Sequence, residues 1–60
     1  EAALLDRVLD VLQRRPCTAH DLAASLGAPY AEVLKPLQRL EGRDRIERRA
    51  RGSATYFQAR

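Results

Sequence analysis

The amino-acid sequence predicts a mainly α fold with a small β-hairpin, in which three helices come before two strands. Apolar residues recur at helical spacing in three segments before residue 44, and prolines and a glycine separate these segments. Residues 45–58 instead alternate loosely around a glycine-containing turn, which is typical of a hairpin. A chain of 60 residues has the length of one small domain, so we expect residues 1–60 to share a single core.

The first helix is predicted from residue 2 to residue 15. Its apolar residues follow the spacing i, i+1, i+4, i+7 and i+8 and form one broad face: Leu4, Leu5, Val8, Val11 and Leu12. Pro16 ends this helix, because a proline disfavours the α conformation of the residue before it. We expect residues 16–18 to form a short extended step.

Residues 18–40 predict two helices joined by a tight turn, which is a helix-turn-helix. Thr18 is the candidate N-cap, since its hydroxyl can accept a hydrogen bond from a free backbone N–H. Gly27 ends the second helix, because glycine adopts the left-handed conformation at little cost. Pro29 suits the first helical position of the third helix, where its missing N–H is not needed. The second helix of such a motif commonly enters a DNA groove.

The third helix is predicted over residues 29–43. Val33, Leu37 and Leu40 share its buried side at 100° per residue, and Tyr30 and Pro36 lie at the margins of that side. Because Pro36 removes a backbone hydrogen bond inside the helix, we expect a kink. The opposite side is the candidate recognition surface, formed by Ala31, Lys35, Gln38 and Gly42 and flanked by Leu34 and Arg39.

The candidate recognition surface carries groups that suit DNA. Gln38 can hydrogen-bond to base edges, and Lys35 and Arg39 can reach guanine or phosphate. Ala31 and Leu34 can contact thymine methyl groups, or equally another protein. The alternative interpretation is an ordinary solvated helix surface.

The third helix is followed by turn residues at 42–44 and then by the predicted hairpin. Residues 45–50 form its first strand, residues 51–53 its tip and residues 54–58 its second strand. Ile46 and Phe57 are the expected core residues of this hairpin.

The exposed side chains of the hairpin are mostly arginines. Arg48, Arg49 and Arg51 lie on or beside this short hairpin. Tyr56 alternates to the side opposite Phe57, where it can pack toward the third helix or meet a sugar-phosphate backbone. A basic hairpin beside a helix-turn-helix is called a wing.

Charge is divided unevenly along the chain. Residues 1–34 carry three arginines against five acidic residues, a net charge of −2. Residues 35–60 carry one lysine and seven arginines against three acidic residues, a net charge of +5. Such a concentrated field attracts polyanions, and arginine suits bidentate phosphate contacts. The alternative interpretation is ordinary solvated surface charge. The five arginines between residues 43 and 51 favour the first interpretation over this one.

Several classes of protein are disfavoured by the residues that are present. The one cysteine, Cys17, excludes an internal disulfide, suits a cytoplasmic, intracellular setting and is expected to be buried. His20 has no cysteine or histidine at metal-ligand spacing. We find no nucleophile–base pair, carboxylate pair or phosphate loop, so we expect no catalysis, no metal and no cofactor. No apolar run is long enough for a membrane span. The sequence starts at Glu1 rather than at Met, which predicts a domain excised from a longer protein.

Three helices followed by an arginine-rich hairpin resemble the winged helix-turn-helix superfamily across essentially the whole chain. The segment DLAASLGAPYAEVLKPLQRLEGRDRIERR resembles the MarR-like bacterial regulators, and RGSATYF resembles the wing of small pilus phase-variation regulators. TAHDL followed by LG resembles the opening of Zα domains, which bind left-handed nucleic acid. Zα domains carry an Asn and a Tyr where this chain has Leu34 and Gln38, and a proline pair where it has Ser53 and Ala54.

The sequence therefore predicts a module that binds double-stranded DNA, with the third helix in the major groove and the wing on the adjacent backbone. The candidate nucleic-acid-binding residues are Tyr30, Ala31, Leu34, Lys35, Gln38, Arg39, Arg48, Arg49, Arg51 and Tyr56. A winged helix used for protein–protein contact, or for RNA binding within a larger protein, remains an alternative, because a fold by itself does not select the partner.

Overall fold

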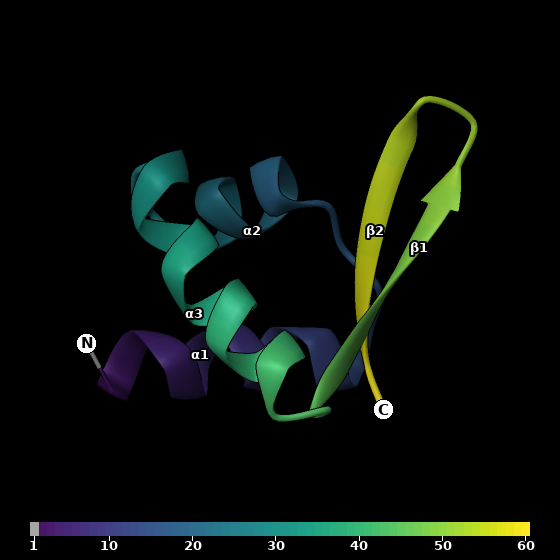
Figure 1. The fold of residues 1–60 in the computed structure, drawn as a ribbon. Helices are drawn as coiled ribbons and strands as arrows, with labels where there is room; N and C mark the ends of the chain where they lie inside the picture. The colour runs from purple at the N-terminus through teal and green to yellow at the C-terminus, as the bar shows by residue number, and fades with distance from the viewer. Residues whose placement is uncertain (1) are drawn as a thin grey trace.

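The protein consists of three helices and a two-stranded antiparallel sheet, as the computed structural model shows for residues 2–60 (Figure 1). In chain order the elements are α1 (Ala2–Arg14), α2 (Ala19–Leu26), α3 (Tyr30–Gly42), β1 (Ile46–Arg51) and β2 (Ala54–Ala59). The predicted fold class is confirmed. The helices pack together on one side of the molecule, and the hairpin of β1 and β2 projects away from them (Figure 1).

One core joins all five elements. Each helix contributes the apolar stripe that its spacing predicts, and the hairpin contributes Ile46 and Phe57. The hydrophobic core consists of Val8, Leu12, Cys17, Ala19, Leu22, Val33, Leu37, Leu40, Ile46 and Phe57. The rest of the predicted α1 face is only half-buried, because α2, α3 and β2 cover only part of it. Burial of these side chains is the main favourable contribution to folding in so small a domain.

The ends of α2 follow the predicted capping chemistry. The Asp21 N–H donates a hydrogen bond of 3.1 Å to the Thr18 hydroxyl, so Thr18 is the N-cap. Gly27 has φ +64°, and the N–H groups of Gly27 and Ala28 donate to the Ala23 carbonyl. Only a glycine adopts this left-handed conformation without strain, which explains where α2 stops.

The structure corrects two details of α3. Pro29 is the residue before the helix, with ψ 146°, and not its first helical residue. Tyr30 is 44% exposed instead of flanking the core. Pro36 is buried within α3, which continues through it, and the kink at this residue stays a prediction. Pro29 is extended because, as the residue before the first helical turn, it still completes the turn that follows α2.

The turn between α3 and β1 also lies one residue later than the sequence predicts. Gly42 is still helical, and the residue with positive φ is Asp44, at +58°. An aspartate tolerates this conformation better than most residues, because its short polar side chain can hydrogen-bond locally. The Arg45 N–H donates a hydrogen bond of 2.9 Å to the Leu40 carbonyl, which closes the turn.

The hairpin has a two-residue turn. Arg51 pairs with Ala54, so Gly52 and Ser53 are its central residues, and Gly52 has φ +58° at the position where a type II′ turn places glycine. The tip is therefore one residue shorter than predicted. A two-residue turn fixes the register of the whole ladder, from Arg51 opposite Ala54 to Ile46 opposite Ala59.

A third backbone segment pairs with β2 on its other edge. The N–H of Cys17 donates to the Phe57 carbonyl at 3.0 Å, and the N–H of Phe57 donates to the Cys17 carbonyl at 2.8 Å. The extended step predicted at residues 16–18 is thus present. Because β2 lies between this step and β1, the hairpin is anchored to the end of α1.

Candidate nucleic-acid interface

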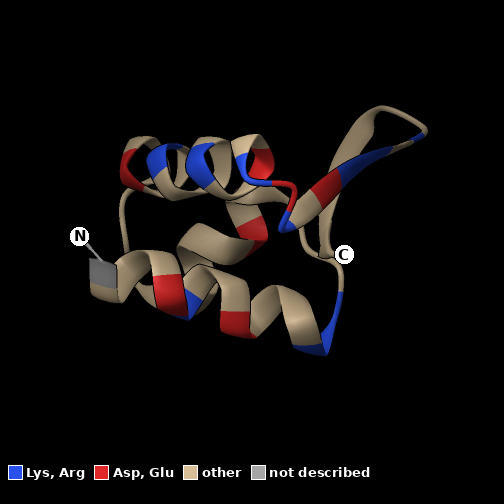
Figure 2. Ribbon diagram, turned by 60° about the horizontal axis from the view of Figure 1, so that its bottom comes forward, with Lys and Arg blue, Asp and Glu red and all other residues tan. Residues whose placement is uncertain are grey.

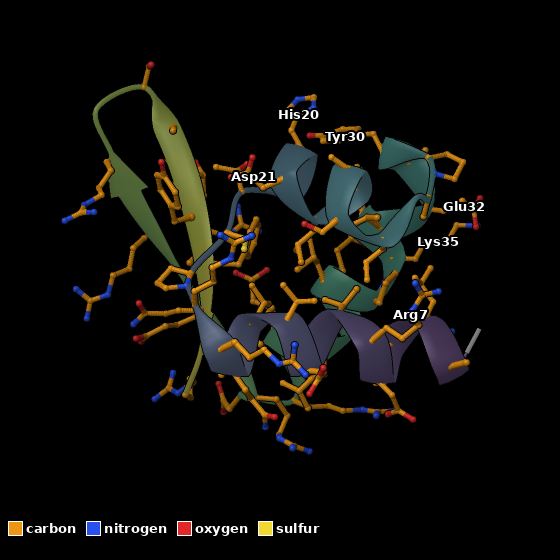
Figure 3. The ribbon with its side chains drawn as sticks, turned by 180° about the vertical axis from the view of Figure 1, so that it is seen from behind. Arg7, His20, Asp21, Tyr30, Glu32 and Lys35 are labelled. Carbon is orange, nitrogen blue, oxygen red and sulfur yellow. The ribbon has the colours of Figure 1, made fainter. Side chains whose placement is uncertain are left out.

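The outward side of α3 carries the predicted recognition residues at the surface. Ala31, Lys35, Gln38 and Arg39 are exposed, and Leu34 is half-buried. Lys35 forms an i, i+3 ion pair with Glu32 at 3.9 Å, and Figure 3 shows both side chains on the same side of α3. Such an exposed pair is weak, so the ammonium group stays available to a stronger anion.

Basic residues continue from α3 into the hairpin. Figure 2 shows Lys and Arg along α3 and along β1 as far as the tip, with some acidic residues among them, and acidic and basic residues also alternate on α1. The positive charge of residues 35–60 therefore lies on the side of the molecule formed by α3 and β1.

Alternation along the strands gives the hairpin two faces. Its inner face consists of Ile46, Arg48, Ala50, Thr55, Phe57 and Ala59, and its outer face consists of Glu47, Arg49, Arg51, Ala54, Tyr56 and Gln58. The buried residues Ile46 and Phe57 identify the inner face as the one that contacts the core.

On the inner face, Arg48 is bonded to α3. Its Nε and Nη2 atoms donate to the two carboxylate oxygens of Glu41 at 2.7 and 2.8 Å, and its guanidinium lies 5.4 Å from the centre of the Phe57 ring. The hydrogen bonds from Arg48 lower the pKa of Glu41 and raise the pKa of Arg48. A bidentate pair of this kind fixes geometry as well as charge, so Arg48 holds the hairpin against the end of α3.

On the outer face, Arg49, Arg51 and Tyr56 surround a shallow pocket of about 420 Å³, together with Pro16 and Gln58. No residue of α3 lines this pocket, so of the two placements predicted for Tyr56 the structure contradicts packing toward the third helix. Strand alternation turns the ring to the side opposite Phe57, away from the helices.

The arginines of the outer face have weak partners or none. Arg49 lies 3.7 Å from Glu47, whose carboxylate also accepts a 2.7 Å hydrogen bond from Gln58. Within residues 2–60, the structure gives Arg51 no ion-pair partner. The outer face therefore presents two arginines that an external anion can engage.

A groove of about 470 Å³ separates α3 from the inner face of the hairpin. One wall is the α3 stripe Tyr30, Leu34, Gln38 and Glu41, and the other includes Arg48 and Thr55. Four of the predicted site residues line this groove: Tyr30, Leu34, Gln38 and Arg48. The other predicted residues lie on the outward side of α3 or on the outer face of the hairpin.

Sequence reasoning missed several residues of the groove, including Thr18, His20, Ser53 and Thr55. His20, at the start of α2, stacks on Tyr30, at the start of α3, with ring centres 4.4 Å apart and planes 20° apart. Only the crossing of the two helices brings these residues together, and no sequence signal indicates it. Among residues 2–60 no three His, Cys, Asp or Glu side chains are grouped to hold a metal ion, and none of the helices described is long and apolar enough to cross a membrane.

Comparisons with known proteins agree with this architecture. The sequence model of one family, described as DprA winged helix domain, matches residues 1–52. The crystal structure of Adhesin competence repressor (AdcR) from Streptococcus pyogenes matches the fold with a TM-score of 0.90 at 25% sequence identity. This match covers 95% of the present chain and 45% of the repressor chain, so the chain spans less than half of that protein. A comparison with curated proteins gives no match.

Proposed function

We propose that this chain, which belongs to the DprA winged helix domain family, binds double-stranded DNA through α3 and the wing. The observation that carries the proposal is the exposed polar and basic side of α3, which continues into the outer face of the hairpin, where Arg49 has one weak partner and Arg51 has none among the described residues. A surface rich in basic residues fits the regular phosphate array of a duplex.

In this proposal α3 lies in the major groove. Gln38 is exposed near the middle of the helix, where its amide can pair bidentately with adenine. Lys35 lies one turn before it and can reach guanine or a phosphate after leaving Glu32. Ala31 and Leu34 supply apolar contacts to thymine methyl groups.

The wing contacts the backbone beside that groove. Arg49 and Arg51 engage phosphates, and Tyr56 packs against the sugars between them. Arg48 is assigned a different role from the one its sequence suggests, because its Nε and Nη2 atoms both donate to the carboxylate of Glu41. We assign Arg48 as a positioning residue that sets the angle of the wing relative to α3.

The proposal treats residues 1–60 as one binding module of a larger protein that acts inside the cell. Phosphate contacts would supply most of the affinity, and contacts from α3 would bias the sequence. Binding of this kind requires no catalytic residue and no cofactor.

The test is an anisotropy titration of labelled duplex DNA at several salt concentrations. Replacing both Arg49 and Arg51 with Ala should weaken binding to every sequence and reduce the slope of log affinity against log salt by roughly 0.9 per lost contact. Gln38→Ala should instead relax the sequence preference, by about 1–3 kcal/mol at one base pair. The proposal is wrong if the unmodified chain shows no salt-dependent affinity for any duplex.

A second candidate function is contact with a protein, which the exposed Tyr30 and the half-buried Leu34 favour. In that case Leu34→Asp should abolish association, while the arginine changes on the wing should have little effect. A structured RNA hairpin belongs in the same titration, because tighter binding to RNA than to duplex DNA would identify RNA as the target.

A further inference from the structure

The strongest unexplained feature of the molecule is the stack of His20 on Tyr30. The two rings are nearly parallel, with centres 4.4 Å apart. Both side chains are exposed, and Tyr30 is the one large hydrophobic side chain of the described residues that is left exposed. Figure 3 shows the two rings together on the side of α2 and α3 that faces away from α1.

Folding does not require this stack. Neither residue belongs to the buried core, and Thr18 caps α2 without help from His20. An aromatic pair held in one orientation at the surface offers a flat π-face to a ligand, and such rings stack on bases of any sequence.

The stack lies at the edge of the groove between α3 and the hairpin. Both rings line the groove, as do Gln38 and Thr55, which can donate and accept hydrogen bonds. Leu34 adds an apolar surface to the same wall. A volume of about 470 Å³ is within the range of roughly 300–1,000 Å³ that is typical of small-ligand sites.

The charge of the groove also suits a nucleotide. Its one carboxylate, Glu41, is bonded through both oxygens to Arg48, so its charge is compensated. Arg48 is the one arginine that lines the groove, and Lys35, Arg49 and Arg51 lie outside it.

We propose that the His20–Tyr30 stack is a platform for an unpaired nucleobase, which enters the groove with its hydrogen-bonding edge toward Thr55. This inference rests on the proposed DNA-binding function and narrows its target to duplexes that carry unpaired nucleotides. Bases inside a duplex are already stacked on both faces and are paired along their edges. Only an unpaired base can use the platform and the groove together.

The experiment compares a blunt duplex with the same duplex extended by a short single-stranded overhang. The overhang contains 2-aminopurine, whose fluorescence falls when the base stacks. We expect the unmodified chain to bind the overhang duplex about 5- to 100-fold more tightly than the blunt duplex, and to quench the probe.

Three variants identify the rings as the cause. His20→Ala and Tyr30→Leu should reduce both the overhang preference and the quenching, whereas Tyr30→Phe keeps the ring and should retain both. The matched control is Arg51→Ala, which should weaken binding to both DNAs and leave the ratio of their affinities unchanged. Thermal unfolding of each variant checks that the fold is intact.

The possible failures are distinguishable. If the chain binds both DNAs equally, with unchanged probe fluorescence, the platform is wrong while the duplex proposal stands. If an overhang preference survives in Tyr30→Leu and His20→Ala, the rings are not its source and the platform is also wrong. If no DNA is bound at any salt concentration, the proposed function itself fails, and this inference fails with it.

Discussion

The two faces of the hairpin are built from the same kinds of residue but have opposite environments. On the inner face Arg48 is bonded to Glu41 of α3 and Phe57 is buried in the core, whereas on the outer face Arg49 has only a weak partner and Tyr56 is half-buried. Arg48 pairs across the ladder with Phe57, and Arg49 with Tyr56. Two neighbouring arginine–aromatic pairs are therefore placed in different surroundings by the alternation of the strand alone.

The two faces of the hairpin therefore have different roles: the inner face attaches the wing to the helices, and the outer face is left for a binding partner. The inner face attaches the hairpin to the helices through burial of Phe57 and through the Arg48–Glu41 pair. The outer face leaves its arginines to an external partner. Since the two functions lie on opposite faces, a substitution on the outer face should leave the attachment of the hairpin to the helices intact.

The largest expected effect comes from truncating the two aromatic residues in turn. Phe57→Ala should lower the free energy of unfolding by about 3–5 kcal/mol, because it leaves a cavity in the shared core. Tyr56→Ala should lower it by about 1 kcal/mol or less, because the ring is only half-buried. Urea denaturation monitored by circular dichroism measures both. Equal losses would show that the two faces do not differ in their contribution to stability.

The next effect concerns DNA binding by neighbouring arginines. Arg49→Ala should reduce the slope of log affinity against log salt by roughly 0.9, because one phosphate contact is lost. Arg48→Ala should leave that slope nearly unchanged, since its guanidinium is occupied by Glu41. Titrations of both variants against one duplex make the comparison. A larger change in Arg48→Ala than in Arg49→Ala would reverse the assignment of the two faces.

Removing the ion-pair partner of Arg48 tests the same difference between Arg48 and Arg49. Glu41→Gln removes the negative partner, so Arg48 becomes available to DNA. We expect the salt dependence to become steeper, by at most roughly 0.9 in slope. Glu41→Gln combined with Arg48→Ala is the control and should return the slope to its original value. An unchanged slope in the single variant would mean that Arg48 cannot reach a phosphate even when it is free.

The smallest expected effect is the pH dependence of the Arg48–Glu41 pair. Arg48 lowers the pKa of Glu41 in the folded protein below its ordinary value of 4.5. The unfolded chain therefore binds more protons between these two pKa values, so stability falls as the pH drops through this window. Because both side chains are partly exposed, the loss should not exceed about 1 kcal/mol.

Thermal unfolding of the unmodified chain and of Glu41→Gln between pH 6 and pH 3 measures this contribution as the difference between the two curves. The variant lacks the titrating group and should lose less stability on acidification. Parallel curves would show that the pair contributes nothing measurable to folding.

The sequence by itself determined the elements and their order. Helical periodicity, the Thr18 cap and the glycine at residue 27 act within a few residues of one another, so local chemistry is enough to predict α1, α2 and α3. The core residues Val33, Leu37, Leu40, Ile46 and Phe57 followed from the same periodicities. The errors in the element bounds lie at element ends, where Pro29 and Asp44 show that neighbouring turns compete with helix propensity.

Only the tertiary structure decided which polar and aromatic side chains meet. Arg48 reaches Glu41 because the turn at Asp44 folds β1 back along α3, and His20 reaches Tyr30 because α2 and α3 cross at their first turns. Both contacts depend on the path of the chain between the partners, which no short-range pattern encodes. The sequence could therefore identify Arg48, Arg49 and Tyr30 as candidates, but the division between residues that hold the wing and residues left for a ligand is set by packing.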